Sequence, residues 1–424
     1  MSDMLPMNGD IYIVRDLANK NKSQGANDVY ERSILNNGVR VLSEFVPYVR
    51  SATIGLWVKT GSSGETSENN GIGHFIEHML FKGTEHRSAR EIAEEIDAVG
   101  GQLNAFTSKE YTCFYAKVLD QHLPLAVDVL ADMFLHSLFD PVEIEKEKGV
   151  VIEEIKMYED SPDELVQDEL ARAVYGDRSL GLNILGTKDT VGSLSRDDII
   201  SYMSRFYGSE RLIISSAGNV PHEKIVKLAE TYFHDLPRGA GETFQTDHEM
   251  AFRHIFRDKD TEQIHICIGL PGLPWNHPDR YALYLTDAIL GGGMSSRLFQ
   301  ELREERGLVY STYSYHASYE NTGVFVIYAA ASPYNAETVL ALIKEIIQDF
   351  RTNGPSPEEL SRAREQLKGS LLLSLESTSN RMSRLAKMEM FDDRLYTPEE
   401  VIGAVDRVQM DDIMRIIRKI AGFD

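Results

Sequence analysis

Cysteine is scarce in this sequence: Cys113 and Cys267 are the only two in 424 residues. They lie far apart, in strand-like surroundings and without a neighbouring metal ligand, which excludes a disulfide framework. A reducing compartment is therefore expected. Both thiols are interpreted as small buried apolar side chains.

Long apolar runs and positive charge are also lacking. No run approaches the roughly 18 apolar residues of a membrane helix. The first residues lack the basic and apolar regions of a secretory signal, and they are acidic rather than Arg-rich, so we expect a cytoplasmic protein without a transit peptide. The net charge of −22 argues against nucleic acid as a partner, because phosphate binding needs a basic surface. This charge would either attract basic peptides or serve solubility alone.

The chain is long enough for two or three domains, and its pattern of elements occurs twice. We expect a polar leader over 1–28, a first half over 29–235, a linker over 236–251 and a second half over 252–424. In both halves an alternating strand is followed by helices, a pair of strands and a long helix that begins at a proline, Pro141 or Pro357. The predicted fold class is α+β, with two homologous halves, each a mixed sheet covered by helices.

The stretch that carries chemistry is 73–80, in which His74, Glu77 and His78 have the spacing i, i+3 and i+4. On a helix these three side chains share one face. Two neutral imidazoles four residues apart can bind one Zn²⁺, and the carboxylate beside them can take a proton from a water molecule that the metal activates. The alternative is an ordinary helix with polar residues on its solvent face. We expect Asn69 or Asn70 to cap this helix and Gly83 to end it.

A third ligand is expected from the helix that begins at Asp140, because catalytic zinc usually has three protein ligands and a water. That helix carries Glu147, Glu153 and Glu154, and the first and last are two turns apart on one face. These glutamates could equally belong to a solvated charged face. The apolar residues 150–152 and Ile155 predict a largely buried stretch, where an unpaired glutamate would be costly.

Four stretches together resemble the pitrilysin/insulinase-type zinc metallopeptidases, in the branch of the mitochondrial processing peptidase and its bacterial homologues. They are HFIEHMLFKGT at 74–84, LNAFTSKE at 103–110, EKGVVIEEI at 147–155 and LREERGLVY at 302–310. The resemblance covers nearly the whole chain from about residue 30. It implies a bacterial protein in which the two halves form a clam-like chamber.

The resemblance also assigns residues. It selects Glu154, 76 positions after His78, as the third zinc ligand, and it makes Glu147 a residue that supports the ligands. It implies that Glu77 is the general base. The edge strand with Asn104, Ala105 and Phe106 would pair with the substrate backbone; many relatives have Tyr at the position of Phe106. From the second half, Arg303 and Tyr310 would reach the substrate and the tetrahedral intermediate, although the residues alone suggest an ordinary helix arginine and a sheet tyrosine.

The sequence thus predicts an endopeptidase with one Zn²⁺ per chain, although Mn²⁺ or Co²⁺ could occupy the same ligands. Its substrates would be peptides or unfolded segments. The second half would be without a metal, because Tyr284 to Ala288 stands where the motif stands in the first half. The resemblance implies a homodimer or a heterodimer with a paralogue. The main alternative is a non-catalytic subunit that binds peptides for a catalytic partner, and a structural or storage zinc protein is a weaker one.

Overall fold

The computed structural model describes residues 30–239, 250–251, 253–392 and 394–422. The expected leader lies outside the described residues, as does most of the expected linker. Among the residues described, no helix combines the length and apolar character that crossing a membrane requires.

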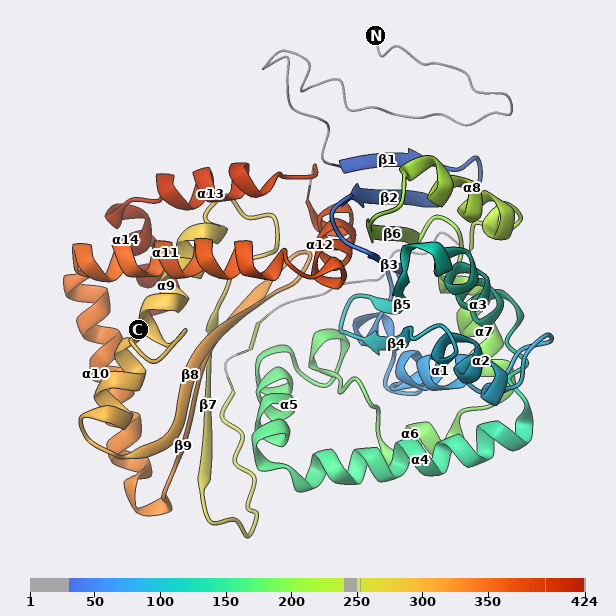
Figure 1. The fold of residues 1–424 in the computed structure, drawn as a ribbon. Helices are drawn as coiled ribbons and strands as arrows, with labels where there is room; N and C mark the ends of the chain where they lie inside the picture. Colours follow the sequence, from blue (N-terminus) through green and yellow to red (C-terminus); the bar gives the residue numbers. More distant parts are fainter. Residues whose placement is uncertain (1–29, 240–249, 252, 393, 423–424) are drawn as a thin grey trace, which may run out of the picture. The chain divides into compact units, whose positions relative to one another are not determined.

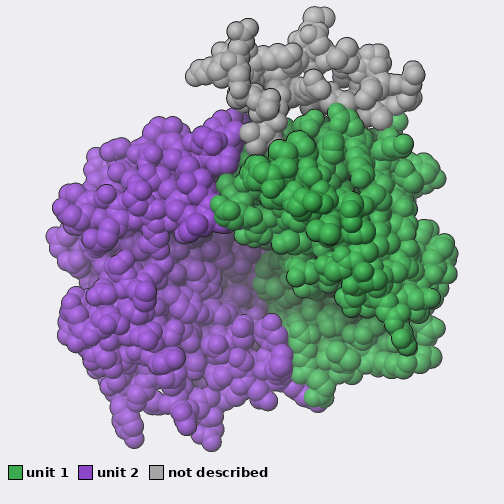
Figure 2. Space-filling view, viewed as in Figure 1, with its two compact units in different colours: residues 1–155, 182–245, 375–390 green, residues 156–181, 246–374, 391–424 purple. Residues whose placement is uncertain are grey.

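The chain forms two compact units, and each unit combines segments from both halves of the sequence (Figures 1 and 2). Unit 1 consists of residues 1–155, 182–245 and 375–390, and unit 2 consists of residues 156–181, 246–374 and 391–424. The proposed boundaries of the sequence repeats therefore do not coincide with the compact units.

Unit 1 contains a six-stranded mixed sheet in the order β1-β2-β6-β3-β5-β4. Its strands are β1 Tyr30–Ile34, β2 Arg40–Phe45, β3 Ser51–Val58, β4 Gln102–Thr107, β5 Thr112–Leu119 and β6 Leu212–Gly218. Only β2 and β6 pair in parallel. The strands β1 and β2 form a hairpin: they pair antiparallel across the turn at 36–38, where Gly38 has a φ of +100°. The strand β4 is an edge of this sheet.

Helices cover both faces of this sheet. The helices of unit 1 are α1 Ile72–Leu80, α2 Ala89–Asp97, α3 Leu123–His136, α4 Pro141–Asp160 up to Ile155, α6 Lys188–Ser193, α7 Arg196–Phe206, α8 His222–Phe233 and α12 Thr378–Phe391 up to Met390. The helices α1, α3 and α8 pack against the strands. The helix α12 contacts alternate residues of β3: the Thr53 and Thr378 hydroxyls are 2.8 Å apart, and Trp57 Nε1 lies 3.0 Å from Met382 Sδ.

Unit 2 contains a three-stranded antiparallel sheet in the order β7-β9-β8, within the residues that are described. Its strands are β7 Ile264–Pro271, β8 Val309–Ser318 and β9 Gly323–Ala331. Its helices are α5 Pro162–Tyr175, α9 Arg280–Leu290, α10 Ala336–Asn353, α11 Pro357–Ser374, α13 Pro398–Arg407 and α14 Met410–Ile420, with a π-helical turn at Phe299–Glu304. A core of α9, α10 and α14 packs on the sheet through residues such as Leu285, Phe325 and Ile343. The helix α5 packs on β7 with a second apolar cluster around Val174 and Val326.

The two sheets have therefore exchanged helices. The helix α5 comes from the first half of the sequence but belongs to unit 2, whereas α12 comes from the second half but belongs to unit 1. The expected burial of α4 and the expected cap of α1, both in the first half, need correction as well. The helix α4 is less buried than its apolar residues suggested: Val150 is 52% exposed, and only Ile144, Glu147, Val151 and Ile155 are buried.

The start of α1 also differs from the prediction. Neither Asn69 nor Asn70 is the N-cap; that position is held by Gly71, which has a φ of +94° and no side chain to act as a cap. The helix ends with Phe81 as its C-cap, so Gly83, with a φ of +115°, lies one position beyond the expected place. The cap prediction was wrong because the acceptor at this helix start comes from further back in the chain, from Glu65.

Candidate metal centre

The helix α1 places the two histidines of the motif side by side. Their ring centroids are 4.6 Å apart, and His74 is 7% exposed. Burial, together with the neighbouring His78, lowers the pKa of His74 to about 3. The His74 imidazole is therefore neutral at any ordinary pH, and the neutral form is the one that binds a metal.

The third group of the site is Glu154 of α4. Its Oε2 lies 3.8 Å from His74 Nε2 and 3.6 Å from His78 Nε2. Ligands about 2.1 Å from a tetrahedral ion are about 3.4 Å apart, so a small contraction would bring these atoms into a zinc coordination shell. In the part of the chain that the structure describes, no other three His, Cys, Asp or Glu residues have ligand atoms this close together. The neighbouring Glu153 is exposed.

Whether these residues fit a zinc ion can be judged from the polar atoms of the site that lack hydrogen-bond partners among the described residues. Within the described ranges, His74 Nδ1 is buried and has no hydrogen-bond partner, and the Nε2 atoms of both histidines face the same carboxylate oxygen of Glu154. His74 is buried and neutral, whereas His78 and Glu154 are partly buried. Together they offer two imidazole nitrogens and one carboxylate oxygen, a donor set that suits Zn²⁺. The residues present therefore fit this metal.

Glu147 contacts His78 at Nδ1, the ring nitrogen that does not face Glu154. Its Oε1 lies 2.8 Å from His78 Nδ1, and its Oε2 lies 2.5 Å from Lys82 Nζ. Burial alone would raise the pKa of the 4%-exposed Glu147, but the hydrogen bonds from His78 and Lys82 outweigh it and hold the pKa below its usual value. This contact fixes the His78 ring so that Nε2 faces the metal position, as a carboxylate partner does for metal-bound histidines generally.

Glu77 lies beside the three ligands and is held by β4. The Thr107 hydroxyl donates a hydrogen bond of 2.6 Å to Glu77 Oε2. Burial raises the pKa of Glu77, and the bond from Thr107 partly opposes this effect. A carboxylate whose pKa is raised in this way is a stronger base than a solvated one.

The other predicted residues fall on β4 and in unit 2. Asn104, Ala105 and Phe106 lie on β4, with Asn104 exposed and the Phe106 ring edge-on to Trp57 at 5.5 Å. Their position on an edge strand leaves one side of β4 without a partner strand among the described residues. Tyr310 is 72% exposed at the start of β8, and the Arg303 guanidinium lies over its ring at 5.4 Å.

The second half keeps part of the arrangement without the ligands. In α9, Asp287 has the place of Glu77, and its carboxylate accepts a 2.5 Å hydrogen bond from Ser314 of β8, as Glu77 does from Thr107. The place of His74 is taken by Tyr284, which stacks on His316 with ring centroids 4.3 Å apart. His316 Nδ1 is 3.1 Å from Asp287 Oδ2. Two metal-binding side chains are too few for a catalytic zinc site.

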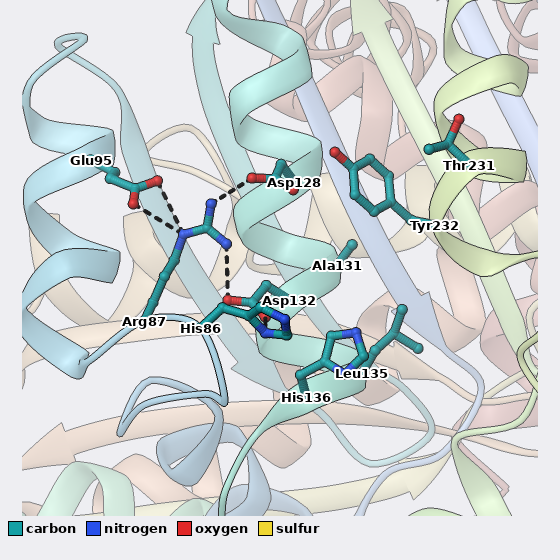
Figure 3. A pocket seen from close by; sticks show the side chains of 10 residues that line it. All are labelled: His86, Arg87, Glu95, Asp128, Ala131, Asp132, Leu135, His136, Thr231 and Tyr232. Atoms are coloured by element: carbon teal, nitrogen blue, oxygen red, sulfur yellow. Dashed lines mark hydrogen bonds and ion pairs between the residues drawn. The ribbon is translucent and has the colours of Figure 1, made fainter.

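A separate pocket of about 460 Å³ in unit 1 also carries histidines and carboxylates (Figure 3). Arg87 lies among its acids, pairing with Glu95 at 3.1 Å, Asp128 at 2.5 Å and Asp132 at 2.9 Å. The single guanidinium pairs with all three carboxylates of this cluster. Thr84 also donates to Asp132, so this cluster braces the segment that follows α1.

Sequence reasoning missed three residues that shape the centre. Glu65 anchors the start of α1, Lys82 pairs with Glu147, and Thr107 holds Glu77. Lys82 and Thr107 lie inside two of the stretches that resemble the metallopeptidases, which is a usable signal. For Glu65 no local pattern gave a signal.

The fold and this donor set define an α+β protein whose candidate metal site joins two histidines of α1 to a glutamate of α4. Residues 40–188 match the family described as Insulinase (Peptidase family M16), and residues 193–367 match the Peptidase M16 inactive domain. The chain belongs to peptidase family M16, a family of zinc proteases.

Relatives and solved structures agree with this assignment. The chain is 47% identical over 390 residues to the uncharacterized zinc protease YmxG of Bacillus subtilis, covering 92% of this chain and 95% of the relative. It is 40% identical over 403 residues to the uncharacterized zinc protease SCO5738 of Streptomyces coelicolor, covering 92% and 87%. A protease structure from Helicobacter pylori has a TM-score of 0.86 at 22% identity, covering 92% of this chain and 96% of that one. At that identity the structure supports the fold alone.

Proposed function

We propose that this chain is a zinc-dependent endopeptidase that cleaves peptides or unfolded protein segments, in the manner of processing peptidases. The observation that carries the proposal is the meeting of His74, His78 and Glu154 around one point, with the carboxylate of Glu77 beside them. The names of the relatives, which are called zinc proteases, support the same reaction class.

In this proposal one Zn²⁺ binds to His74, His78 and Glu154 and, when bound, polarises a water molecule and the substrate carbonyl. Glu77 accepts a proton from the attacking water and then gives it to the leaving amine. Thr107 holds Glu77 in the orientation that this transfer needs, and Glu147 holds His78.

The substrate would bind as an added strand. The open edge of β4 offers backbone groups to an extended peptide next to Thr107, which contacts the base. An extended strand is available in peptides and unfolded segments but not in a folded domain. We assign Arg303 and Tyr310 to substrate binding and to stabilising the oxyanion, on the family resemblance alone.

The test is cleavage of a peptide library by wild type and by Glu77→Gln, with products mapped by mass spectrometry and metal content by atomic absorption. We expect Glu77→Gln to retain one Zn²⁺ per chain and to lose about 10²- to 10⁴-fold in kcat/KM. A chelator should stop wild-type cleavage, and added Zn²⁺, Mn²⁺ or Co²⁺ should restore it.

Unchanged cleavage by Glu77→Gln would mean that a contaminant cuts the peptides or that another group is the base. Peptide binding without cleavage under all three metals would instead identify the chain as a non-catalytic binding subunit.

A further inference from the structure

We infer that Glu65 is a positioning residue of the metal centre: its buried carboxylate holds the first turn of α1 and so fixes the direction of His74. The inference rests on the proposed metal site but not on peptide cleavage. Glu65 lies within residues 40–188, which match the family, but outside the four stretches on which the sequence resemblance rests.

The first turn of α1 lacks an ordinary cap. Helix starts leave backbone N–H groups unpaired, and a side chain at the N-cap usually accepts one of them. Here the N-cap is Gly71, which has no such side chain. Glu65 takes over this role from six residues before the cap: Oε2 accepts from Gly71 N at 2.7 Å, and Oε1 accepts from Gly73 N at 2.9 Å.

A side chain also donates to the Glu65 carboxylate. Asn70 Nδ2 donates to Glu65 Oε2 at 2.8 Å and to the carbonyl oxygen of Asn183 at 2.7 Å. Glu65 itself is 6% exposed. Three hydrogen-bond donors and the positive end of the helix dipole thus surround one buried carboxylate and offset part of the cost of burying it. Burial still outweighs them and raises the pKa of Glu65 to about 7.

Two glycines let the backbone of this turn pack closely, Gly71 against Leu185 and Gly73 against Glu65. A Cβ at Gly71 would lie 2.6 Å from the carbonyl oxygen of Leu185, and the φ of +94° disfavours any other residue there. A Cβ at Gly73 would lie 3.0 Å from Glu65 Oε1. The backbone of the turn therefore packs directly on the carboxylate, with no side chain between them.

His74 follows Gly73 directly, so the amide held by Glu65 belongs to the residue before the first ligand. Glu147 holds His78 and Thr107 holds Glu77, whereas His74 Nδ1 has no partner in the part of the chain that the structure describes. The backbone anchor at Gly73 takes the place of a side-chain partner for His74. Both Glu65 oxygens are engaged by these donors and Glu65 is not one of the three grouped ligands, so it acts through the helix.

The experiment compares wild type with Glu65→Gln and measures the Kd for Zn²⁺ by competition with a chromogenic chelator, without peptide. In Glu65→Gln one oxygen becomes an NH₂ group facing another donor, so at least one anchor bond is lost. Partners behind metal ligands change affinity by about 10–100-fold when mutated, and we expect a loss in that range. The Co²⁺ absorption spectrum should change, because the ligand geometry changes.

The matched control is Glu68→Gln, on the same loop, whose exposed carboxylate accepts from the Ser67 hydroxyl. We expect no change in Kd for this variant. A folded Glu65→Gln with wild-type Zn²⁺ affinity and Co²⁺ spectrum would overturn the inference, and so would a drop in thermal stability without a change in affinity.

A second variant decides the question if Glu65→Gln does not fold. Gly73→Ala improves helix propensity by about 1 kcal/mol but pushes a methyl group against Glu65 Oε1. It should fold and still bind Zn²⁺ more weakly, whereas unchanged affinity would contradict the inference. Where both single variants fold, their effects should not add, because they disturb the same contact. Wild-type Zn²⁺ binding without any cleavage would refute the proposed function and leave this inference standing.

Discussion

Glu153 and Glu154 are adjacent carboxylates on α4 that differ in the side of the helix they occupy. Glu154 Oε2 faces both histidines, whereas Glu153 is exposed. We expect Glu154→Gln to weaken Zn²⁺ binding by two orders of magnitude or more, because an anionic ligand becomes neutral. Glu153→Gln is the control and should leave the affinity unchanged. Chelator competition measures both, and equal losses would show that the assignment between the two glutamates is wrong.

A second residue-scale prediction concerns His222, at the start of α8. Both ring nitrogens are within 2.8 Å of hydroxyls, Nε2 of Ser33 and Nδ1 of Ser43, and the side chain is 2% exposed. Burial lowers its pKa to about 4. Between about pH 6.5 and 4 the unfolded chain therefore binds more protons at this residue than the folded chain, and stability falls as the pH falls.

The loss from His222 should reach about 2 kcal/mol at pH 5. Thermal unfolding of wild type and His222→Gln at pH 7 and pH 5 measures this loss. Other groups also titrate between these pH values, but they do so in both proteins, so the difference between the two proteins reports His222. We expect the advantage of wild type over the variant to shrink at pH 5. An advantage that does not depend on pH would show that His222 is not held neutral.

At this scale the sequence identified the ligand candidates but not their support. The spacing of His74, Glu77 and His78 is local, so helix geometry alone brings them together. The choice between Glu153 and Glu154 needed the family spacing. Glu65 could not be found from a cap pattern, because cap signals act within about four residues and this acceptor lies six residues before the N-cap.

At the scale of elements, the Asp140 side chain caps the start of α4, and its contribution to the free energy of unfolding can be measured. Asp140 Oδ1 accepts from Val142 N at 2.8 Å and from Glu143 N at 3.2 Å, as the Asp-Pro-x-Glu pattern predicts. Asp140→Ala should lower the unfolding free energy by about 1 kcal/mol and Tm by roughly 2–4 °C.

Asp140→Asn is the control for the cap and should stay close to wild type, since Asn caps equally well. The Zn²⁺ affinity should not change in either variant, because Glu147 lies almost two turns into the helix. A large loss of affinity in Asp140→Ala would mean that the whole of α4 shifts when its cap is removed.

Most strands and helices were predictable because their periodicity and caps are local signals. In both halves of the sequence the alternating strand (β3 or β7), the pair of strands (β4 and β5, or β8 and β9) and the long helix that begins at Pro141 or Pro357 are present. The burial of α4 was not predictable, because some of its apolar residues, such as Val150, are exposed. Apolar content indicates that a helix has a partner but does not say which of its faces is covered.

At the scale of the molecule, the duplicated sequence does not fold as two separate halves. The two exchanged helices, α5 and α12, have no sequence signal that identifies their partner sheet, because that partner is far away in the chain. The exchange therefore became visible only in the structure.

The helix α12 is built into unit 1 by polar contacts as well as apolar ones. Arg32 makes two bonds of 2.9 Å to the Glu389 carboxylate, and Ser215 Oγ donates to the carbonyl oxygen of Met382 at 2.7 Å. A Cβ at Gly55 of β3 would lie 2.8 Å from Met382 Sδ, so the helix packs closely on the strand. Without α12, the face of the sheet around Trp57 would be exposed to water, and the free energy gained by burying it would be lost.

The last prediction follows from this exchange. A fragment of residues 1–239 contains all the ligands of the metal centre but lacks α12. We expect it to bind a hydrophobic dye, to aggregate and to lose most of its Zn²⁺ affinity, whereas co-expression with residues 240–424 should restore a complex that co-purifies. The control is the full chain with a protease site inserted within 240–249 and cut after folding, which should stay together and keep its Zn²⁺. If the 1–239 fragment is monomeric, unfolds cooperatively and binds Zn²⁺ like the whole chain, then α12 is dispensable and the metal centre depends on the first half alone.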